Sequence, residues 1–142
     1  MGGRRRVLGA AAALAAAMAM RSAFAQDGRT STVQTAARDW LALGDRGDGG
    51  ATWDAAGKQF KNAITRERWS ETFAGVRKPF GTMTQRSVLS TTFPNSVPGA
   101  PDGDYSMVLF RTSFVNRADS RETVTLEREP DGAWRVVGYV IQ

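Results

Sequence analysis

The side chains that could bind or transform a ligand in this sequence are carboxylates, arginines and aromatic rings. The 142-residue chain contains no histidine and no cysteine. Nucleophile systems of the Ser-His-Asp and Cys-His types are therefore excluded, as are zinc or copper sites built on imidazole or thiolate. Acid–base chemistry near neutral pH would have to use Asp, Glu, Tyr or Lys. We expect neither a resident metal ion nor a cofactor.

One candidate ligand site combines two arginines, two aromatic side chains and one acid. Arg86 and Arg111 fall on neighbouring predicted strands, and we expect both on the concave face of a sheet, near Trp69 and Tyr105. A guanidinium beside aromatic rings in an apolar cleft binds carboxylate or phosphate through paired hydrogen bonds. With Glu122 on a further strand, these residues predict a site for a small anion. The alternative is a solvated ladder of charges, whose exposed pairs add little stability.

Three functions are compatible with this set of residues. The leading hypothesis is a non-enzymatic domain that binds a small molecule or another envelope protein, because no catalytic set is complete. The alternative is an enzyme that uses a buried carboxylate such as Glu122 as a base, since an apolar pocket raises carboxylate pKa values. A third possibility is a structural protein that dimerises through its sheet, so the protein would be a monomer or a homodimer.

The first 25 residues have the order of an export signal. Three arginines at positions 4–6 precede an apolar, alanine-rich run over residues 7–20, and Ala23-Phe24-Ala25 forms a small-x-small cleavage site before Gln26. The run is too short to span a bilayer, which takes roughly 20 residues. We expect cleavage near Ala25-Gln26 and a periplasmic or secreted product without a membrane anchor. The arginines fit either the general secretory or the twin-arginine route.

Removing this segment changes the charge of the chain. The whole chain has a formal net charge of +5, but residues 1–25 contain four of its 19 basic residues and none of its 14 acidic ones. The remaining 15 basic and 14 acidic residues are dispersed and give a net charge of +1. Nucleic-acid binding needs a clustered basic face, so this class of function is not expected. Residues 26–142 suit a single domain.

The hydrophobic periodicity changes from helical to strand-like near Gly81. Apolar residues at helical spacing predict helices over residues 31–43 and 51–63, and a third one after the N-cap Thr65. The first of these helices would be capped by Thr30 or Ser31. Alternating or continuous apolar runs predict strands over residues 86–93, 105–115, 122–129 and 134–141.

These elements predict an α+β domain. We expect three N-terminal helices packed on a curved, four-stranded antiparallel meander sheet. The four tryptophans would anchor the shared core: Trp40, Trp53, Trp69 and Trp134.

Several motifs resemble one known family. They include WLALGD at residues 40–45, Trp53 followed by Phe60 and Trp69, PGAPDGDY at residues 98–105, and DGAWRVVGY at residues 131–139. The spacing of these motifs, with Phe114 and Glu122 between them, resembles the DUF4019 family of small exported bacterial proteins. The resemblance implies export and a compact domain similar to the cone-shaped NTF2-like or cystatin-like folds, but it implies no activity.

Overall fold

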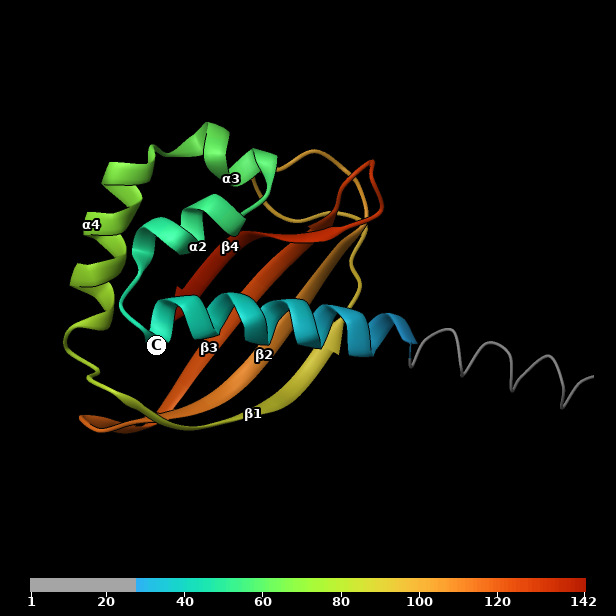
Figure 1. Cartoon of the computed structure of the whole chain (residues 1–142). Coiled ribbons are helices and arrows are strands. Elements are labelled where there is room, and N and C mark those ends of the chain that lie inside the picture. Colours follow the sequence, from blue (N-terminus) through green and yellow to red (C-terminus); the bar gives the residue numbers. More distant parts are fainter. Residues whose placement is uncertain (1–27) are drawn as a thin grey trace, which may run out of the picture. The chain divides into compact units, whose positions relative to one another are not determined.

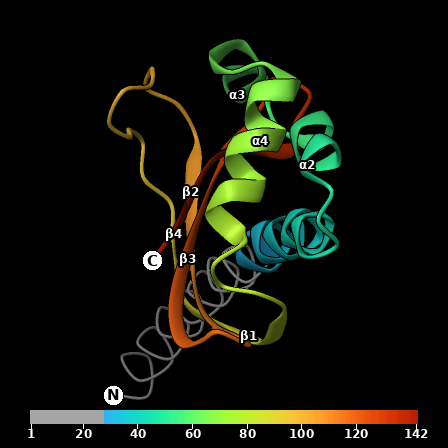
Figure 2. The same ribbon diagram turned by 90° about the vertical axis from the view of Figure 1, so that its left-hand side faces the viewer.

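A computed structural model describes residues 28–142 of the chain. Its compact unit spans Thr32–Gln142. In this unit, helices cover one face of a four-stranded sheet, as the two ribbon views show (Figures 1 and 2). The predicted export signal lies outside the described residues. No helix of the described part is long and apolar enough to cross a membrane.

The helical layer differs from the prediction in two places. Residues 28–45 are helical, so the expected cap at Thr30 or Ser31 is wrong. A Ser or Thr inside a helix costs only about 0.5 kcal/mol relative to Ala, which is too little to fix a helix start. The predicted helix over residues 51–63 is instead two helices, α2 (Gly49–Ala55) and α3 (Lys58–Ala63).

The break between α2 and α3 lets the backbone reach the sheet. Ala56 and Gly57 are extended, and the Gly57 N–H donates a 2.8 Å hydrogen bond to the carbonyl of Val136. A Cβ at Gly57 would lie 3.1 Å from Val137 Cγ1, so a side chain there would crowd the strand.

The predicted N-cap is confirmed at α4 (Arg66–Arg77), where Thr65 Oγ1 accepts from the N–H of Arg68.

The predicted meander sheet is confirmed. It consists of β1 (Met83–Thr92), β2 (Tyr105–Phe114), β3 (Arg117–Arg128) and β4 (Trp134–Ile141), paired antiparallel in chain order. β3 begins before residue 122, the predicted start, because the chain reverses tightly between β2 and β3. The predicted turn before β4 has Gly132 at φ 85°, a conformation that suits glycine.

The core lies between the helices and the inner face of β2 and β3. Four side chains of this inner face are fully buried: Val108, Phe110, Val124 and Leu126. Along each strand they alternate with side chains that face away from the helices. Two of the four tryptophans, Trp40 and Trp69, are buried in this core, whereas Trp53 and Trp134 pack at its margin and are partly exposed. Around Trp69, the rings of Trp40, Phe60 and Phe73 lie within 6.4 Å between centroids.

Replacing Gly44 by Ala should destabilise the domain. A Cβ at Gly44 would lie 2.5 Å from Cζ of Phe73, whose ring is buried in the core. Overpacking of this kind costs about 1–3 kcal/mol, which urea denaturation measures. The matched control is Gly75→Ala in α4, where a Cβ meets nothing within 4 Å. That variant should gain about 0.5–1 kcal/mol from helix propensity. Equal effects of both substitutions would contradict the packing argument.

Candidate functional site

Glu122 forms the centre of a buried polar network. Its side chain has 0% exposure, on the inner face of β3. One carboxylate oxygen accepts from Arg86 Nε at 2.9 Å and from Thr112 Oγ1 at 2.5 Å, and the other accepts from the hydroxyl of Tyr139 at 2.5 Å. Burial, followed by the nearby charge of Glu122, raises the pKa of Tyr139, so its hydroxyl stays protonated and donates. The network joins all four strands.

A second acid extends this network to the helices. Asp45, at the end of the N-terminal helix, accepts from Arg86 Nη1 at 2.7 Å and from Arg77 Nη2 at 2.9 Å. Burial opposes ionisation of Asp45, but its hydrogen bonds with the two arginines hold the pKa of the carboxyl below its usual value. Burial likewise disfavours the charge of Arg86, but the hydrogen bonds and charges of Asp45 and Glu122 together raise the pKa of Arg86 above its usual value.

Arg77 completes the network through aromatic rings. Its Nε and Nη1 have no hydrogen-bond partner in the described structure, although both atoms are buried. The guanidinium carbon lies 4.9 Å from the centroid of the Phe114 ring and 5.6 Å from that of Phe73. Ring faces attract a cation through their quadrupole, which accounts for a guanidinium without further acceptors.

The predicted placement on the face toward the helices is correct for Arg86 and wrong for Arg111. The strand register pairs Arg111 with Ser87, so Arg111 faces away from the helices while Arg86 faces them. The Arg111 side chain is 57% exposed and lies 3.5 Å from Asp119, whereas that of Arg86 is 7% exposed. Arg111 thus fits the alternative of a solvated charge ladder, shared here with Asp119 and Arg121.

The other three predicted site residues occupy three different environments. Trp69 is part of the core and also lines a cavity. Tyr105 is buried, and its hydroxyl donates to the carbonyl of Pro101 at 2.6 Å. Glu122 does not line the cavity, and its carboxylate is bonded to Arg86, Thr112 and Tyr139. The structure therefore brings Arg86 and Glu122 together, but it does not join the five residues into one site.

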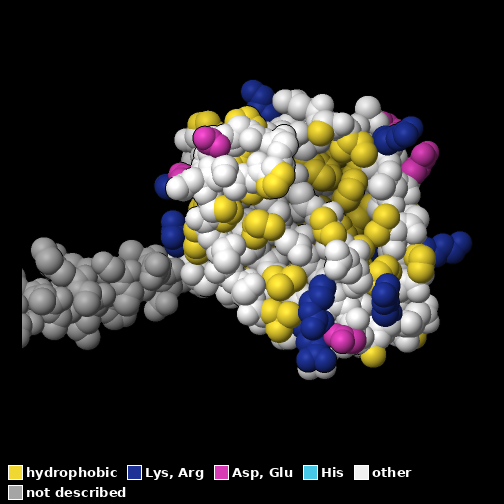
Figure 3. Space-filling view, turned by 180° about the vertical axis from the view of Figure 1, so that it is seen from behind, with side chains coloured by type: hydrophobic (Ala, Val, Ile, Leu, Met, Phe, Trp, Pro, Cys, Tyr) yellow, Lys and Arg dark blue, Asp and Glu magenta, His cyan; other side chains and the backbone are white. Residues whose placement is uncertain are grey.

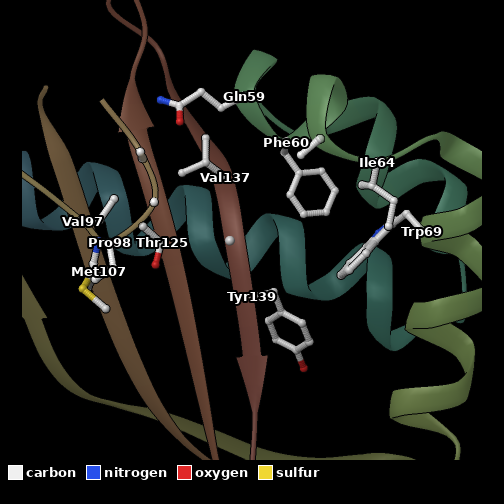
Figure 4. A pocket seen from close by; sticks show the side chains of 14 residues that line it. Gln59, Phe60, Ile64, Trp69, Val97, Pro98, Met107, Thr125, Val137 and Tyr139 are labelled. Atoms are coloured by element: carbon white, nitrogen blue, oxygen red, sulfur yellow. The ribbon is translucent and has the colours of Figure 1, made fainter. Parts of the chain in front are cut away.

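A cavity of about 510 Å³ runs along β4, between the helices and the loop that precedes β2 (Figure 4). On the helix side its wall is aromatic and aliphatic, with Phe60, Ile64 and Trp69. On the loop side the wall is Val97 and Pro98. The strands contribute Met107, Thr125, Val137, Gly138 and Tyr139. Seen from behind, hydrophobic side chains gather around a hollow in the surface (Figure 3).

Among residues 28–142, no charged side chain lines this cavity. Its polar side chains are the amide of Gln59, the hydroxyl of Thr125, the indole of Trp69 and the phenol of Tyr139. The last two are already engaged, because Trp69 Nε1 donates to Thr52 Oγ1 at 2.8 Å and the Tyr139 hydroxyl donates to Glu122. The arrangement can enclose an uncharged molecule of mostly apolar surface.

Most residues of the cavity wall carry no functional signal in the sequence. Gln59, Phe60 and Val137 attracted no functional prediction, and Tyr139 entered only as part of a motif. The alternation in β3, with Val124 and Leu126 facing inward, does extend to Glu122. Since Val124 pairs with Tyr139 of β4, the same alternation places the Tyr139 ring on the inner face. The sequence alone does not give this pairing of β3 with β4.

Comparison with known proteins agrees with this fold. The model of a family described as "Protein of unknown function (DUF4019)" matches residues 36–139. A solved structure from Catenulispora acidiphila aligns with a TM-score of 0.55 and 13% identity, over 84% of this chain and 94% of that one. ActVI-ORFA from Streptomyces coelicolor aligns with a TM-score of 0.50 and 12% identity, over 81% and 96%. These neighbours have the cone-like, NTF2-like fold that was expected. No curated protein sequence matches significantly.

Replacing Glu122 by Gln should strongly destabilise the domain. The change keeps the shape of the side chain but leaves the buried Arg86 without one of its two anionic partners. Removing one charge of a buried pair costs about 3 kcal/mol or more, which urea denaturation at pH 7 measures. The matched control is Asp119→Asn, which removes an acid that is 65% exposed and should change stability little. Full stability of the Glu122 variant would contradict a structural role for the network.

Proposed function

We propose that this chain, which belongs to the DUF4019 family, is a binding domain for a small uncharged molecule. The cavity along β4 carries this proposal. Its volume of about 510 Å³ lies within the range of ligand sites, and its wall combines aromatic and aliphatic side chains with a few polar groups. The structural neighbours support the fold of such a domain, and the identity of the ligand comes from the cavity alone.

A neutral ligand fits the cavity better than the small anion that the sequence predicts. Arg86 already bonds Glu122 and Asp45, so binding a ligand anion would require breaking buried ion pairs. Arg111 is exposed, is paired with Asp119 and does not line the cavity. Desolvating an anion in a cavity without a cation is unfavourable. A neutral molecule is therefore favoured over a carboxylate or phosphate.

Binding without catalysis is the simpler reading of this geometry. The carboxylate proposed as a base, Glu122, accepts three hydrogen bonds from side chains. Tyr139 lies between it and the cavity, since its ring lines the cavity while its hydroxyl bonds Glu122. A general base must reach the proton that it abstracts. Turnover by Glu122 would need this network to open.

We also propose that the domain works outside the cytoplasm. The order of basic, apolar and small residues over positions 4–25 supports export with removal of this segment. Expression in a Gram-negative host should give a periplasmic protein whose measured mass is that of residues 26–142. Replacing both Ala23 and Ala25 by Phe should block cleavage, because the cleavage site takes small side chains there. A cytoplasmic protein that retains residues 1–25 would contradict export.

A matched pair of dyes tests the cavity and the charge of its ligand. N-phenylnaphthylamine is neutral, and anilinonaphthalenesulfonate is the same ring system with a sulfonate. We expect the neutral dye to bind at least about tenfold more tightly, because desolvation of the sulfonate is not compensated. Fluorescence titration of the folded domain measures both affinities. Tighter binding of the sulfonate would support the anion hypothesis instead.

Two substitutions on α3 locate the dye. Ala63 is exposed at the end of α3 and lines the cavity, so Ala63→Trp should fill its mouth and weaken binding about tenfold or more. Asn62 is also exposed on α3 but does not line the cavity, so Asn62→Trp is the control and should leave the affinity unchanged. An equal effect of both variants would place the dye elsewhere.

A further inference from the structure

Gln59 is a polar side chain of the cavity wall whose orientation is fixed by residues outside that wall. It lies in α3 and is half-buried, and its amide nitrogen donates to two groups behind the wall. One bond, of 3.0 Å, goes to the hydroxyl of Tyr105, and the other goes to a carboxylate oxygen of Glu127. An amide nitrogen has two hydrogens, so both are used.

Neither hydrogen bond allows the amide of Gln59 to flip, which would exchange its nitrogen and oxygen. The hydroxyl of Tyr105 has a single hydrogen, which it donates to the carbonyl of Pro101 at 2.6 Å, so toward Gln59 it can only accept. A carboxylate such as that of Glu127 also only accepts. Both neighbours therefore require the nitrogen of Gln59 on their side. The carbonyl oxygen must point the other way.

That oxygen, Oε1, has no hydrogen-bond donor among residues 28–142. Figure 4 shows it on the side of Val137, with the nitrogen turned away. It is thus an oriented acceptor in the wall of an otherwise mostly apolar cavity. Gln59 is only half-buried, and its Oε1 is not among the buried atoms that lack a partner, so water can reach it in the free protein. A ligand that fills the cavity would bury this oxygen and must supply a donor or lose affinity.

We infer that Gln59 selects a neutral, largely apolar ligand that carries one O–H or N–H group, which donates to Gln59 Oε1. This inference rests on the proposed function and names the class of its ligand. The adjacent charge of Glu127 supports it, because a carboxylate or phosphate on the ligand would be repelled at the point where a hydroxyl is attracted. The loop before β2 contributes through the carbonyl of Pro101, which takes the hydrogen of the Tyr105 hydroxyl and so leaves that hydroxyl as an acceptor for the amide.

Three naphthalene derivatives test this inference: naphthalene, naphthol and its methyl ether, methoxynaphthalene. They share one ring system, and only naphthol can donate. We expect the folded wild-type domain to bind naphthol on the order of fivefold more tightly than the ether, since one neutral hydrogen bond contributes that much. Titration with intrinsic tryptophan fluorescence, checked by calorimetry, measures the ratio. Equal affinities for naphthol and the ether would overturn the inference and leave the proposed function intact.

Two variants identify the acceptor and its orientation. Gln59→Met keeps the length of the side chain without its oxygen, so the preference for naphthol should fall to about one while naphthalene binds as before. Tyr105→Phe removes one group that orients the amide, so the preference should fall partway and methoxynaphthalene should bind no more weakly. Circular dichroism checks that both variants fold.

The other possible results separate the role of Gln59 from the proposed binding function. A preference that survives in Gln59→Met overturns the role of Gln59, and a preference undiminished in Tyr105→Phe overturns the orientation argument. If Gln59→Met does not fold, the wild-type ratio together with Tyr105→Phe still decides. Absence of binding by all three compounds would overturn the proposed function and, with it, the ligand class.

Discussion

The ion pair between Arg86 and Glu122 is the interaction on which the rest of the structure depends. A carboxylate with 0% exposure is tolerable only if it is paired and its oxygens accept hydrogen bonds. Arg86 from β1, Thr112 from β2 and Tyr139 from β4 meet this requirement together, and each must hold its position to do so. Asp45 and Arg77 connect the same network to the helices. The network therefore fixes how the helical layer sits on the sheet.

The same network gives the cavity its chemical character. Arg86 and Glu122 neutralise each other within the core, so neither offers a charge to a ligand. Tyr139 presents its ring to the cavity because its hydroxyl is held by Glu122. On the other side, the cavity wall depends on hydrogen bonds that join α3 to the loop before β2 through Gln59, Tyr105 and Pro101. Two separate polar networks thus frame an uncharged space.

Predictions from the sequence succeeded where a single element carries its own signal. The strand alternation of β3 places Val124 and Leu126 inward, and the hydroxyl of Thr65 marks the start of α4. They failed where two elements had to be aligned. Arg86 and Arg111 each have the expected strand conformation, but the register pairs Arg111 with Ser87, so the two arginines lie on opposite faces of the sheet. The break at Gly57 likewise depends on Val136 of β4, which lies far away in the chain.

The sequence by itself determined the α+β class, the meander order of the strands and the exclusion of histidine or cysteine chemistry. These properties follow from composition and local periodicity, which do not require knowledge of distant contacts. Only the tertiary structure decided that Arg86 pairs with Glu122, that Arg111 lies on the opposite face, and that Gln59 lines a cavity. The reason is physical: whether a polar side chain is available to a ligand depends on which partners from other elements already satisfy it.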